Sequence, residues 1–265
     1  QAVKIAGKIG LPLMVRPSYV LGGRAMEIVY EKKQLKEFVK EAFRVAERNP
    51  ILIDKFIDNA MEVDVDAISD GRHVIVAGIM QHIEEAGIHS GDSACSLPPV
   101  SIKPFLIKEI EKQTIRLALS LKVKGLMNIQ FAIKKDEIFV IEVNPRASRT
   151  IPFVSKAKNI PFAKIASRIM VGEPLSKFNL RSKTKKMFAV KEAVFPFNKF
   201  PNSDLLLGPE MKSTGEVMGF DKNFGMAFAK SQIAASNSLP TKGLAFISLK
   251  NTHKEEGVKL ARQLV

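Results

Sequence analysis

The chain has 265 residues, of which 46% are hydrophobic and 26% are charged, so it can form one large or two medium globular domains. No apolar run approaches the roughly 20 residues that span a bilayer, and nothing resembles a signal peptide, so we expect no membrane partner. The single cysteine, Cys95, excludes an internal disulfide and is typical of a reducing compartment such as the cytoplasm.

A net charge of +14, from 41 basic and 27 acidic residues, is compatible with nucleic acid or with small anions as partners. The basic residues are scattered, and their densest run, 176–191, contains no acid and is typical of a polar linker or a solvated surface loop. With no Trp and only two Tyr, the chain offers few rings on which bases could stack. We therefore expect no nucleic-acid partner and interpret the charge as complementary to anionic small molecules.

Helical and strand patterns alternate along the first half of the chain. The expected helices cover 1–9, 33–48 and 107–121, and the expected strands cover 13–16, 27–30, 51–56, 61–69 and 74–82. The strand at 61–69 alternates strictly, so Glu62, Asp64 and Asp66 point the same way. Taken alone, such a row could be a solvated acidic face, an interpretation that suits Asp66 best.

A hairpin is expected between 126 and 146, with two apolar strands joined by a short polar turn. Glu142 and Asn144 share one face of the second strand, about 7 Å apart at Cα. Asn128 and Gln130 share a face of the first strand, and a three-residue turn would set Gln130 opposite Glu142 and the two asparagines opposite each other. The alternative is a half-buried hairpin with a solvated polar face, but Gln and Asn are poor strand formers, which favours a functional patch.

This patch has the chemistry of a phosphoryl-transfer site. Carboxylate and amide oxygens are hard ligands, which Mg²⁺ or Mn²⁺ accepts while it also holds nucleotide phosphates. Pro145 ends the strand, and Arg146 then supplies a fixed positive charge for an anionic reacting group.

Helices and irregular segments dominate the expected C-terminal half. We expect helices at 161–171, 227–235 and from Lys254, irregular structure at 195–209, a linker at 236–240 and a buried strand at 243–249. Antiparallel strands flanked by helices indicate an α+β protein. The strand at 243–249 and the helix after it would be the first step of a further α/β domain, and the start at Gln1 leads us to expect a piece of a longer chain.

Several segments together resemble the large chain of carbamoyl phosphate synthetase. They are RPSYVLGGRAM (16–26), EVDVDAI (62–68), HSGDSACSLPP (89–99), GLMNIQFA (125–132), IEVNPRASRTIPFVSKA (141–157), PFNKFP (196–201) and LGPEMKSTGEVMG (207–219). The likeness covers essentially the whole chain and is to the second ATP-grasp half, which phosphorylates carbamate. It implies an ATP-grasp fold, two α+β lobes that clamp ATP, over 1–237. Over 238–265 it implies the truncated start of an α/β, methylglyoxal-synthase-like allosteric domain.

The resemblance also implies which residues bind ATP. Arg16 would contact the phosphates, with Gly22 and Gly23 in a lid that approaches them closely. The implied nucleotide contacts are Arg16, Lys55, Ile57, Glu62, Gly87, Ile88, His89, Ser90, Gln130 and Glu142. Among these, Lys55 and Ile57 would contact adenine, although many relatives have a histidine in place of Lys55. Glu62 would accept hydrogen bonds from the ribose, and His89 has no second His or Cys close by in sequence, so zinc is not expected there.

Two divalent ions, Mg²⁺ or Mn²⁺, follow from the same resemblance. Gln130 and Glu142 would hold one ion, and Glu142 and Asn144 the other. Arg146 would be catalytic by steadying the transferred group and the carbamate, and Arg149 is a second candidate for the same anion.

The implied reaction converts carbamate and ATP to carbamoyl phosphate and ADP, within a synthesis from bicarbonate, glutamine-derived ammonia and two ATP. The implied partners are a small glutaminase subunit and the first ATP-grasp half, on the same or a separate chain. The product could serve arginine or pyrimidine biosynthesis. Three alternatives are another ATP-grasp ligase or carboxylase, a nucleotide-binding or regulatory fragment without turnover, and a nucleic-acid binder.

Overall fold

The computed structural model describes residues 2–18, 23–46, 49–180, 187–199, 204–238 and 240–264. Its helices are α1 (Ala2–Ile9), α2 (Lys32–Val45), α3 (Pro104–Ser120), α4 (Ile151–Lys158), α5 (Phe162–Met170), α6 (Phe224–Ala234) and α7 (Lys254–Leu264). Its strands are β1 (Leu13–Pro17), β2 (Glu27–Val29), β3 (Ile51–Lys55), β4 (Met61–Asp70), β5 (Val74–Glu85), β6 (Cys95–Leu97), β7 (Lys124–Lys134), β8 (Glu137–Asn144), β9 (Phe188–Val194) and β10 (Gly215–Asp221). Within these ranges no helix is long and apolar enough to cross a bilayer.

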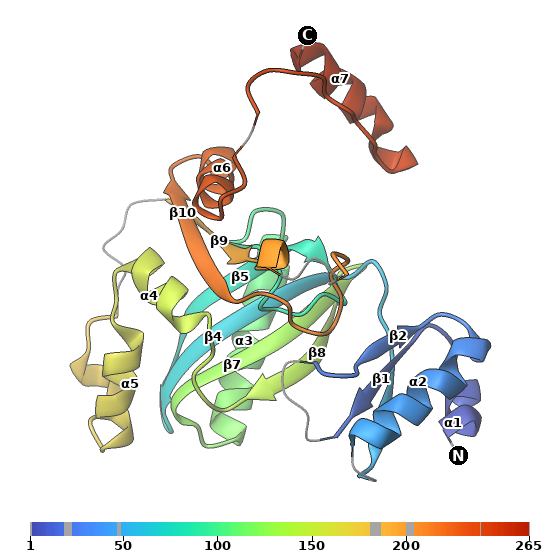
Figure 1. The fold of residues 1–265 in the computed structure, drawn as a ribbon. Helices are drawn as coiled ribbons and strands as arrows, with labels where there is room; N and C mark the ends of the chain where they lie inside the picture. Colours follow the sequence, from blue (N-terminus) through green and yellow to red (C-terminus); the bar gives the residue numbers. More distant parts are fainter. Residues whose placement is uncertain are drawn as a thin grey trace.

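The strands form two antiparallel sheets, which belong to two lobes (Figure 1). The small lobe has the order β2-β1-β3 and is packed against α1 and α2. Apolar positions of α2 recur at helical spacing, and Leu35 and Ala42 are buried against Leu13 and Val15 of β1. This packing confirms the amphipathic helix and the short strands that the sequence predicts for the first 55 residues.

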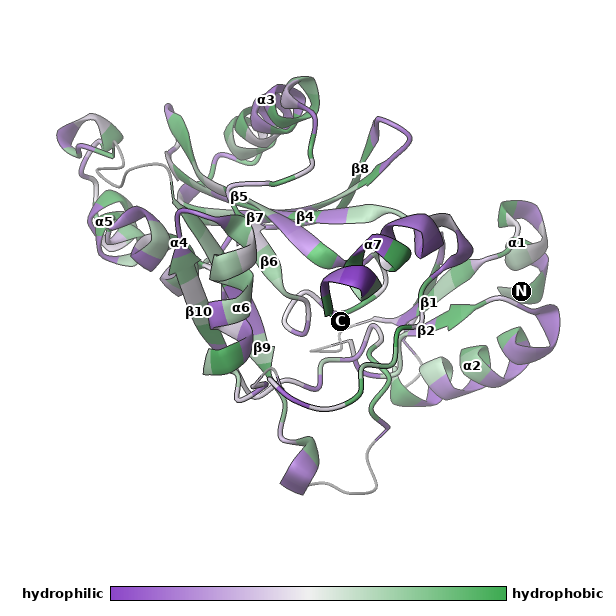
Figure 2. Ribbon diagram, turned by 90° about the horizontal axis from the view of Figure 1, so that it is seen from above, coloured by the Kyte–Doolittle hydropathy of each residue, from purple (hydrophilic) through white to green (hydrophobic). Residues whose placement is uncertain are grey.

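The large lobe is built on a seven-stranded sheet with the order β10-β9-β6-β5-β4-β7-β8. Strict alternation along β4 turns Val63, Val65 and Ala67 toward α3 on one face, and Figure 2 shows α3 on that side of the sheet. The opposite face is covered by α4 and α5, and it carries Asp64 and Asp66. Asp64 and Asp66 therefore lie inside the protein, on the face of the sheet that α4 and α5 cover.

The hairpin of β7 and β8 has the predicted register, but a different turn produces it. Gln130 lies opposite Glu142, and Asn128 lies opposite Asn144. The turn has two residues, Lys135 and Asp136, both with positive φ, as a type I′ turn requires. A β-bulge between Glu142 and Val140 inserts one extra residue and restores the register that a three-residue turn would have given.

Three predictions are wrong. The run 176–191 is not a solvated loop throughout, because its end enters β9, where Lys191 is only 1% exposed between β6 and β10. The segment 243–249 is no buried strand: Leu244 and Phe246 are fully exposed, and among the described residues no strand pairs with it. Asp66 is not part of a solvated face, because it is 0% exposed beneath the loop that leads to α4.

The sequence reasoning also missed β6, β10 and α4, which are short or follow a loop of mixed composition. The described part of 195–209 is irregular as predicted, apart from one 3₁₀ turn at Phe197–Lys199.

Candidate active site

Two hollows lie along the polar face of β7 and β8, the larger one where the small lobe meets this face. The larger is a cleft of about 800 Å³ with mainly apolar walls. Its lining residues are Leu11, Pro12, Met14, Arg16, Met26, Asp54, Lys55, Phe56, Ile57, Asp58, Glu62, Ala86, Gly87, Ala132, Lys134, Phe139, Val140 and Ile141. Five of the predicted nucleotide contacts, Arg16, Lys55, Ile57, Glu62 and Gly87, are therefore brought together here. An apolar slot with a few polar groups at its rim suits a flat heterocycle joined to a polar sugar.

The charged residues of this cleft are held by their neighbours. Arg16 pairs with Asp54 across β1 and β3 at 2.8 Å. Lys55 donates to the backbone oxygens of Gly10 (3.2 Å) and Leu11 (2.5 Å), so its side chain closes one end of the slot. Glu62 accepts the amide proton of Gly87 at 3.2 Å, which ties the loop after β5 to β4.

The smaller hollow, about 120 Å³, is polar and continues from the cleft along the same strands. Its lining residues are Asp64, His89, Ser90, Gly91, Asn128, Gln130, Glu142, Asn144, Arg146, Ser148, Arg149, Thr150 and Glu216. Every predicted metal ligand lines it, as do Arg146 and Arg149, the two arginines predicted for the reacting anion. Ile88 is the one predicted contact that lines neither hollow, although both its neighbours do.

The ligand atoms of Gln130, Glu142 and Asn144 fit a cation that is shared with phosphate. Gln130 uses its amide nitrogen to donate to Ser90 Oγ at 3.0 Å, so its carbonyl oxygen is the atom that can ligate. Asn144 Nδ2 donates to Glu142 Oε1 at 2.6 Å, and Arg146 Nη2 donates to Asn144 Oδ1 at 3.1 Å. The described residues contain no cluster of three or more His, Cys, Asp and Glu side chains that could hold a metal by themselves. One carboxylate with two amides therefore suits a divalent ion whose remaining ligands are phosphate oxygens.

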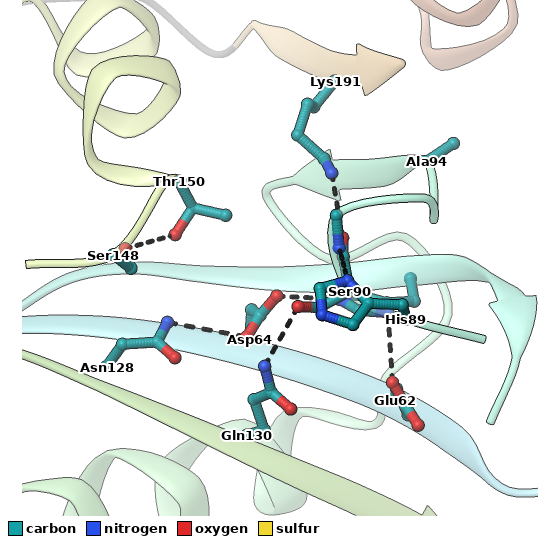
Figure 3. A network of polar contacts seen from close by, with 12 residues as sticks. Glu62, Asp64, His89, Ser90, Ala94, Asn128, Gln130, Ser148, Thr150 and Lys191 are labelled. Carbon is teal, nitrogen blue, oxygen red and sulfur yellow. Dashed lines mark hydrogen bonds and ion pairs between the residues drawn. The ribbon is translucent and has the colours of Figure 1, made fainter. Parts of the chain in front are cut away.

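The loop between β5 and β6 forms the wall opposite the hairpin (Figure 3). His89 accepts the amide proton of Gly91 at Nδ1 (3.0 Å), and its own amide donates to Gly208 (2.8 Å). Burial and the nearby charge of Arg149 lower the pKa of His89, which keeps the imidazole neutral at pH 7. Lys191 Nζ donates to the backbone oxygen of Ser90 at 3.1 Å, so β9 supports this loop from beneath.

Behind the two hollows a buried histidine joins two carboxylates. His82 Nε2 lies 2.9 Å from Asp64, and its Nδ1 lies 3.4 Å from Glu62. Burial lowers the pKa of His82, but the hydrogen bond to Asp64 and the nearby charge of Glu62 outweigh it and raise that pKa to about 9. Burial raises the pKa of Asp64, but the hydrogen bond and the charge of His82 outweigh it and hold that pKa below its usual value. At neutral pH the group is an imidazolium that bridges two carboxylates, and it fixes β4 to β5 beside Glu62.

Of the two glycines predicted to lie in a lid, Gly22 is outside the described residues, whereas Gly23 is described. Gly23 has φ +73°, and a Cβ there would lie 1.9 Å from the backbone oxygen of Pro209. Only glycine fits such an approach, so the small lobe meets the segment before β10 at this point.

Sequence reasoning did not assign Asp64, Ser148, Thr150, Lys191 and Glu216 to the site. Asp64 could have been found, because it shares the strand face of Glu62. Lys191 and Glu216 come from β9 and β10, which lie far along the chain, and no local pattern connects them to the hairpin.

Comparisons with known proteins agree with this geometry. The family model described as "Carbamoyl-phosphate synthase L chain, ATP binding domain" matches residues 1–178. The "Carbamoyl phosphate synthase large chain, C-terminal section" of Aquifex aeolicus is 51% identical over 99% of this chain and 52% of its own length. The large chain of Archaeoglobus fulgidus is 57% identical over 97% of this chain and 24% of its own length. The chain thus spans about half, or about a quarter, of these relatives.

Among solved structures, the complex of biotin carboxylase with β,γ-ATP from Campylobacter jejuni is similar with a TM-score of 0.70 and 16% identity. The likeness covers 90% of this chain and 60% of that one. At this identity it shows the fold alone, which is the ATP-grasp fold expected from the sequence.

Proposed function

The chain belongs to the ATP-binding domain family of the carbamoyl-phosphate synthase large chain, and from that premise we propose that it is the half in which ATP phosphorylates carbamate. A carbamate oxygen would attack the γ-phosphorus of ATP, the bond to the β,γ-bridging oxygen would break, and carbamoyl phosphate and ADP would leave. The likeness to a relative named as the C-terminal section supports the choice of half. The whole synthesis, from bicarbonate and ammonia with a second ATP, belongs to the same proposal.

The single observation that carries the proposal is the juxtaposition of Gln130, Glu142 and Asn144 with Arg146 in one polar hollow. It adjoins an apolar cleft large enough for adenosine. In this arrangement Lys55 and Ile57 would border the base, Glu62 would bind the ribose, and Arg16 would neutralise phosphate. The loop of Gly87, Ile88, His89 and Ser90 would close over the phosphates.

Gln130, Glu142 and Asn144 would hold two divalent ions, Mg²⁺ or Mn²⁺, between the hairpin and the phosphates. Such ions, when bound, neutralise the charge that develops on the transferred group. Arg146 would add a fixed cation at the same place, and its guanidinium donates to Asn144 Oδ1 and to the backbone oxygen of Ala147.

Carbamate suits this hollow because it is an anionic oxygen nucleophile that needs no base. His89, the imidazole that lines the hollow, has a lowered pKa, and its Nδ1 accepts a backbone proton. It is thus suited to donating through Nε2 to a phosphate or carbamate oxygen. The small, walled volume would also shield carbamate, which decomposes in water.

The remaining expectations belong to the same proposal. The ATP-grasp unit would end near 237, and 238–265 would begin a methylglyoxal-synthase-like domain, in which the exposed segment 243–249 would find the sheet that it lacks here. The partners would be the first ATP-grasp half and a glutaminase subunit, in the cytoplasm.

The test is ATP synthesis from carbamoyl phosphate and Mg·ADP by the full-length protein. We expect Glu142→Gln to lower the rate at least about 100-fold, as removal of a charge-stabilising group does, with the melting temperature unchanged. The matched control is Glu137→Gln, at the turn of the same hairpin and exposed, which should keep the wild-type rate. Full activity of Glu142→Gln would refute the two-ion assignment. A folded, nucleotide-binding wild type without this activity would refute the proposal, leaving a nucleotide-binding or regulatory fragment or another ATP-grasp ligase.

A further inference from the structure

Asp66 of β4 is fully buried and accepts hydrogen bonds from three side chains of other elements. Asn128 Nδ2 and Ser148 Oγ donate to Oδ1 at 3.0 and 2.7 Å, and Thr150 Oγ1 donates to Oδ2 at 2.6 Å. The hydroxyls of Ser148 and Thr150 also lie 2.7 Å apart. All three partners are neutral, so the carboxylate is satisfied by hydrogen bonds from neutral groups. Burying a carboxylate among neutral donors remains costly even when it is hydrogen-bonded, so the arrangement calls for a functional explanation.

Two of these partners belong to the loop at 145–150, which joins the edge strand β8 to α4. This loop carries Arg146 and Arg149, both exposed, whereas Thr150 at its end is 6% exposed. The Arg146 contacts are local, to Asn144 and Ala147. Figure 3 shows Ser148 and Thr150 side by side at the sheet that carries Asn128. The contacts of Ser148 and Thr150 with Asp66 therefore bind an exposed loop to the centre of the sheet.

The loop also meets the opposite wall of the polar hollow. A Cβ on Gly91 would lie 3.1 Å from Arg149 Nη2 and 3.2 Å from His89 Nδ1. The guanidinium of Arg149 thus lies directly against the backbone of the loop that carries His89 and Ser90. A small movement of 145–150 would shift both arginines relative to that wall.

We infer that Asp66 is a positioning residue for phosphoryl transfer, which fixes the loop of Arg146 and Arg149 over the reacting anion through Ser148 and Thr150. The inference rests on the proposed function and deepens it. Asp66 acts by accepting hydrogen bonds, and its negative charge is not what the loop requires. Because the adenosine cleft is lined by other residues, Asp66 affects the transfer step and leaves nucleotide affinity unchanged. Displacing a catalytic group by about 1 Å costs roughly 100-fold in rate.

Two substitutions at Asp66 separate hydrogen bonding from charge. In Asp66→Asn the amide oxygen still accepts from Asn128 and Ser148, and the NH₂ group can donate to the hydroxyl of Thr150. We expect this variant to stay within about fivefold of the wild-type rate of ATP synthesis from carbamoyl phosphate. Asp66→Val has a similar shape but no acceptor, and we expect a loss of at least about 100-fold in kcat with the KM for Mg·ADP unchanged. If Asp66→Asn is as impaired as Asp66→Val, the inference is overturned.

A second pair of variants covers the case in which Asp66→Val does not fold. Thr150→Ser keeps the donor and should keep the rate, whereas Thr150→Val removes it and should lower kcat at least about tenfold. The matched control is Asp70→Ala on the same strand, because Asp70 also anchors loops, through the amides of Arg72, His73 and Leu175. It should lower the melting temperature without changing kcat. Equal kcat losses in Asp70→Ala and Thr150→Val would show a merely structural role.

Hydrogen exchange of the amides of 146–150 tests the inference without any turnover. In the full-length protein these amides should exchange faster in Asp66→Val and Thr150→Val than in wild type, Asp66→Asn or Asp70→Ala. Unchanged exchange would refute the anchoring role even if the enzyme is active. Faster exchange in a protein that makes no ATP from carbamoyl phosphate would support the anchor and refute the proposed function instead.

Discussion

The buried imidazolium of His82 makes stability depend on alkaline pH in a way that a single substitution can isolate. Burial opposes its charge, but Asp64 and Glu62 raise the pKa from 6.5 to about 9. A group whose pKa is higher in the folded than in the unfolded chain binds a proton more tightly when folded. Its contribution is therefore complete below pH 6.5 and is lost as the pH rises through 9. At about 1.4 kcal/mol per pKa unit, the loss is on the order of 3 kcal/mol.

The assay is urea unfolding between pH 6 and pH 10, compared for wild type, His82→Gln and the control His73→Gln. His73 lies on the turn between β4 and β5 with its side chain 72% exposed. We expect His82→Gln to be the less stable at pH 6, because Asp64 then lacks its cation, and to approach wild type by pH 10. His73→Gln should keep the wild-type slope. Parallel pH curves for wild type and His82→Gln would refute the reasoning.

Two further predictions concern the lid contact and the buried thiol. Gly23→Ala should raise the KM for ATP severalfold, because its φ of +73° and the backbone oxygen of Pro209 exclude a Cβ. The control is Gly7→Ala on α1, where a Cβ would have nothing within 4 Å. An unchanged KM in Gly23→Ala would contradict a role for the contact between Gly23 and Pro209. Burial raises the pKa of Cys95 to about 12, so iodoacetamide at pH 8 should label this thiol only after unfolding. Rapid labelling of the native protein would contradict the burial of Cys95.

The hairpin shows how much of the site could be predicted from sequence. Strand alternation together with an assumed three-residue turn aligned Gln130 with Glu142 and Asn128 with Asn144; both pairings are confirmed, although the turn has two residues and a bulge restores the register. The turn type was not predictable to the same degree, because a two-residue turn with a bulge and a three-residue turn give the same register at the site. Local periodicity determines which face a side chain takes, and a hydrophobic core on the other face of β7 enforces the choice.

Residues that depend on long-range pairing escaped the same reasoning. Lys191 looked like part of a basic surface run, because its burial comes from β6 and β10, which lie roughly 95 and 25 residues away in sequence. The prediction for 243–249 failed in the opposite sense, since its apolar run predicts a buried strand, whereas no strand in the described part of the chain pairs with it. An apolar pattern predicts that a segment can be buried, but burial also requires a partner surface.

Asp66 combines both lessons, because its strand face was correctly predicted and its environment was not. Alternation placed it beside Asp64 and Glu62, and an acid at the end of such a row is usually solvated. What buries it is a loop more than 80 residues downstream, whose hydroxyls need an acceptor as much as Asp66 needs donors. These hydrogen bonds do not fully offset the free-energy cost of burying the carboxylate, because burial raises the pKa of Asp66 to about 6 even with them in place. Asp66→Asn should therefore be at least as stable as wild type at pH 7.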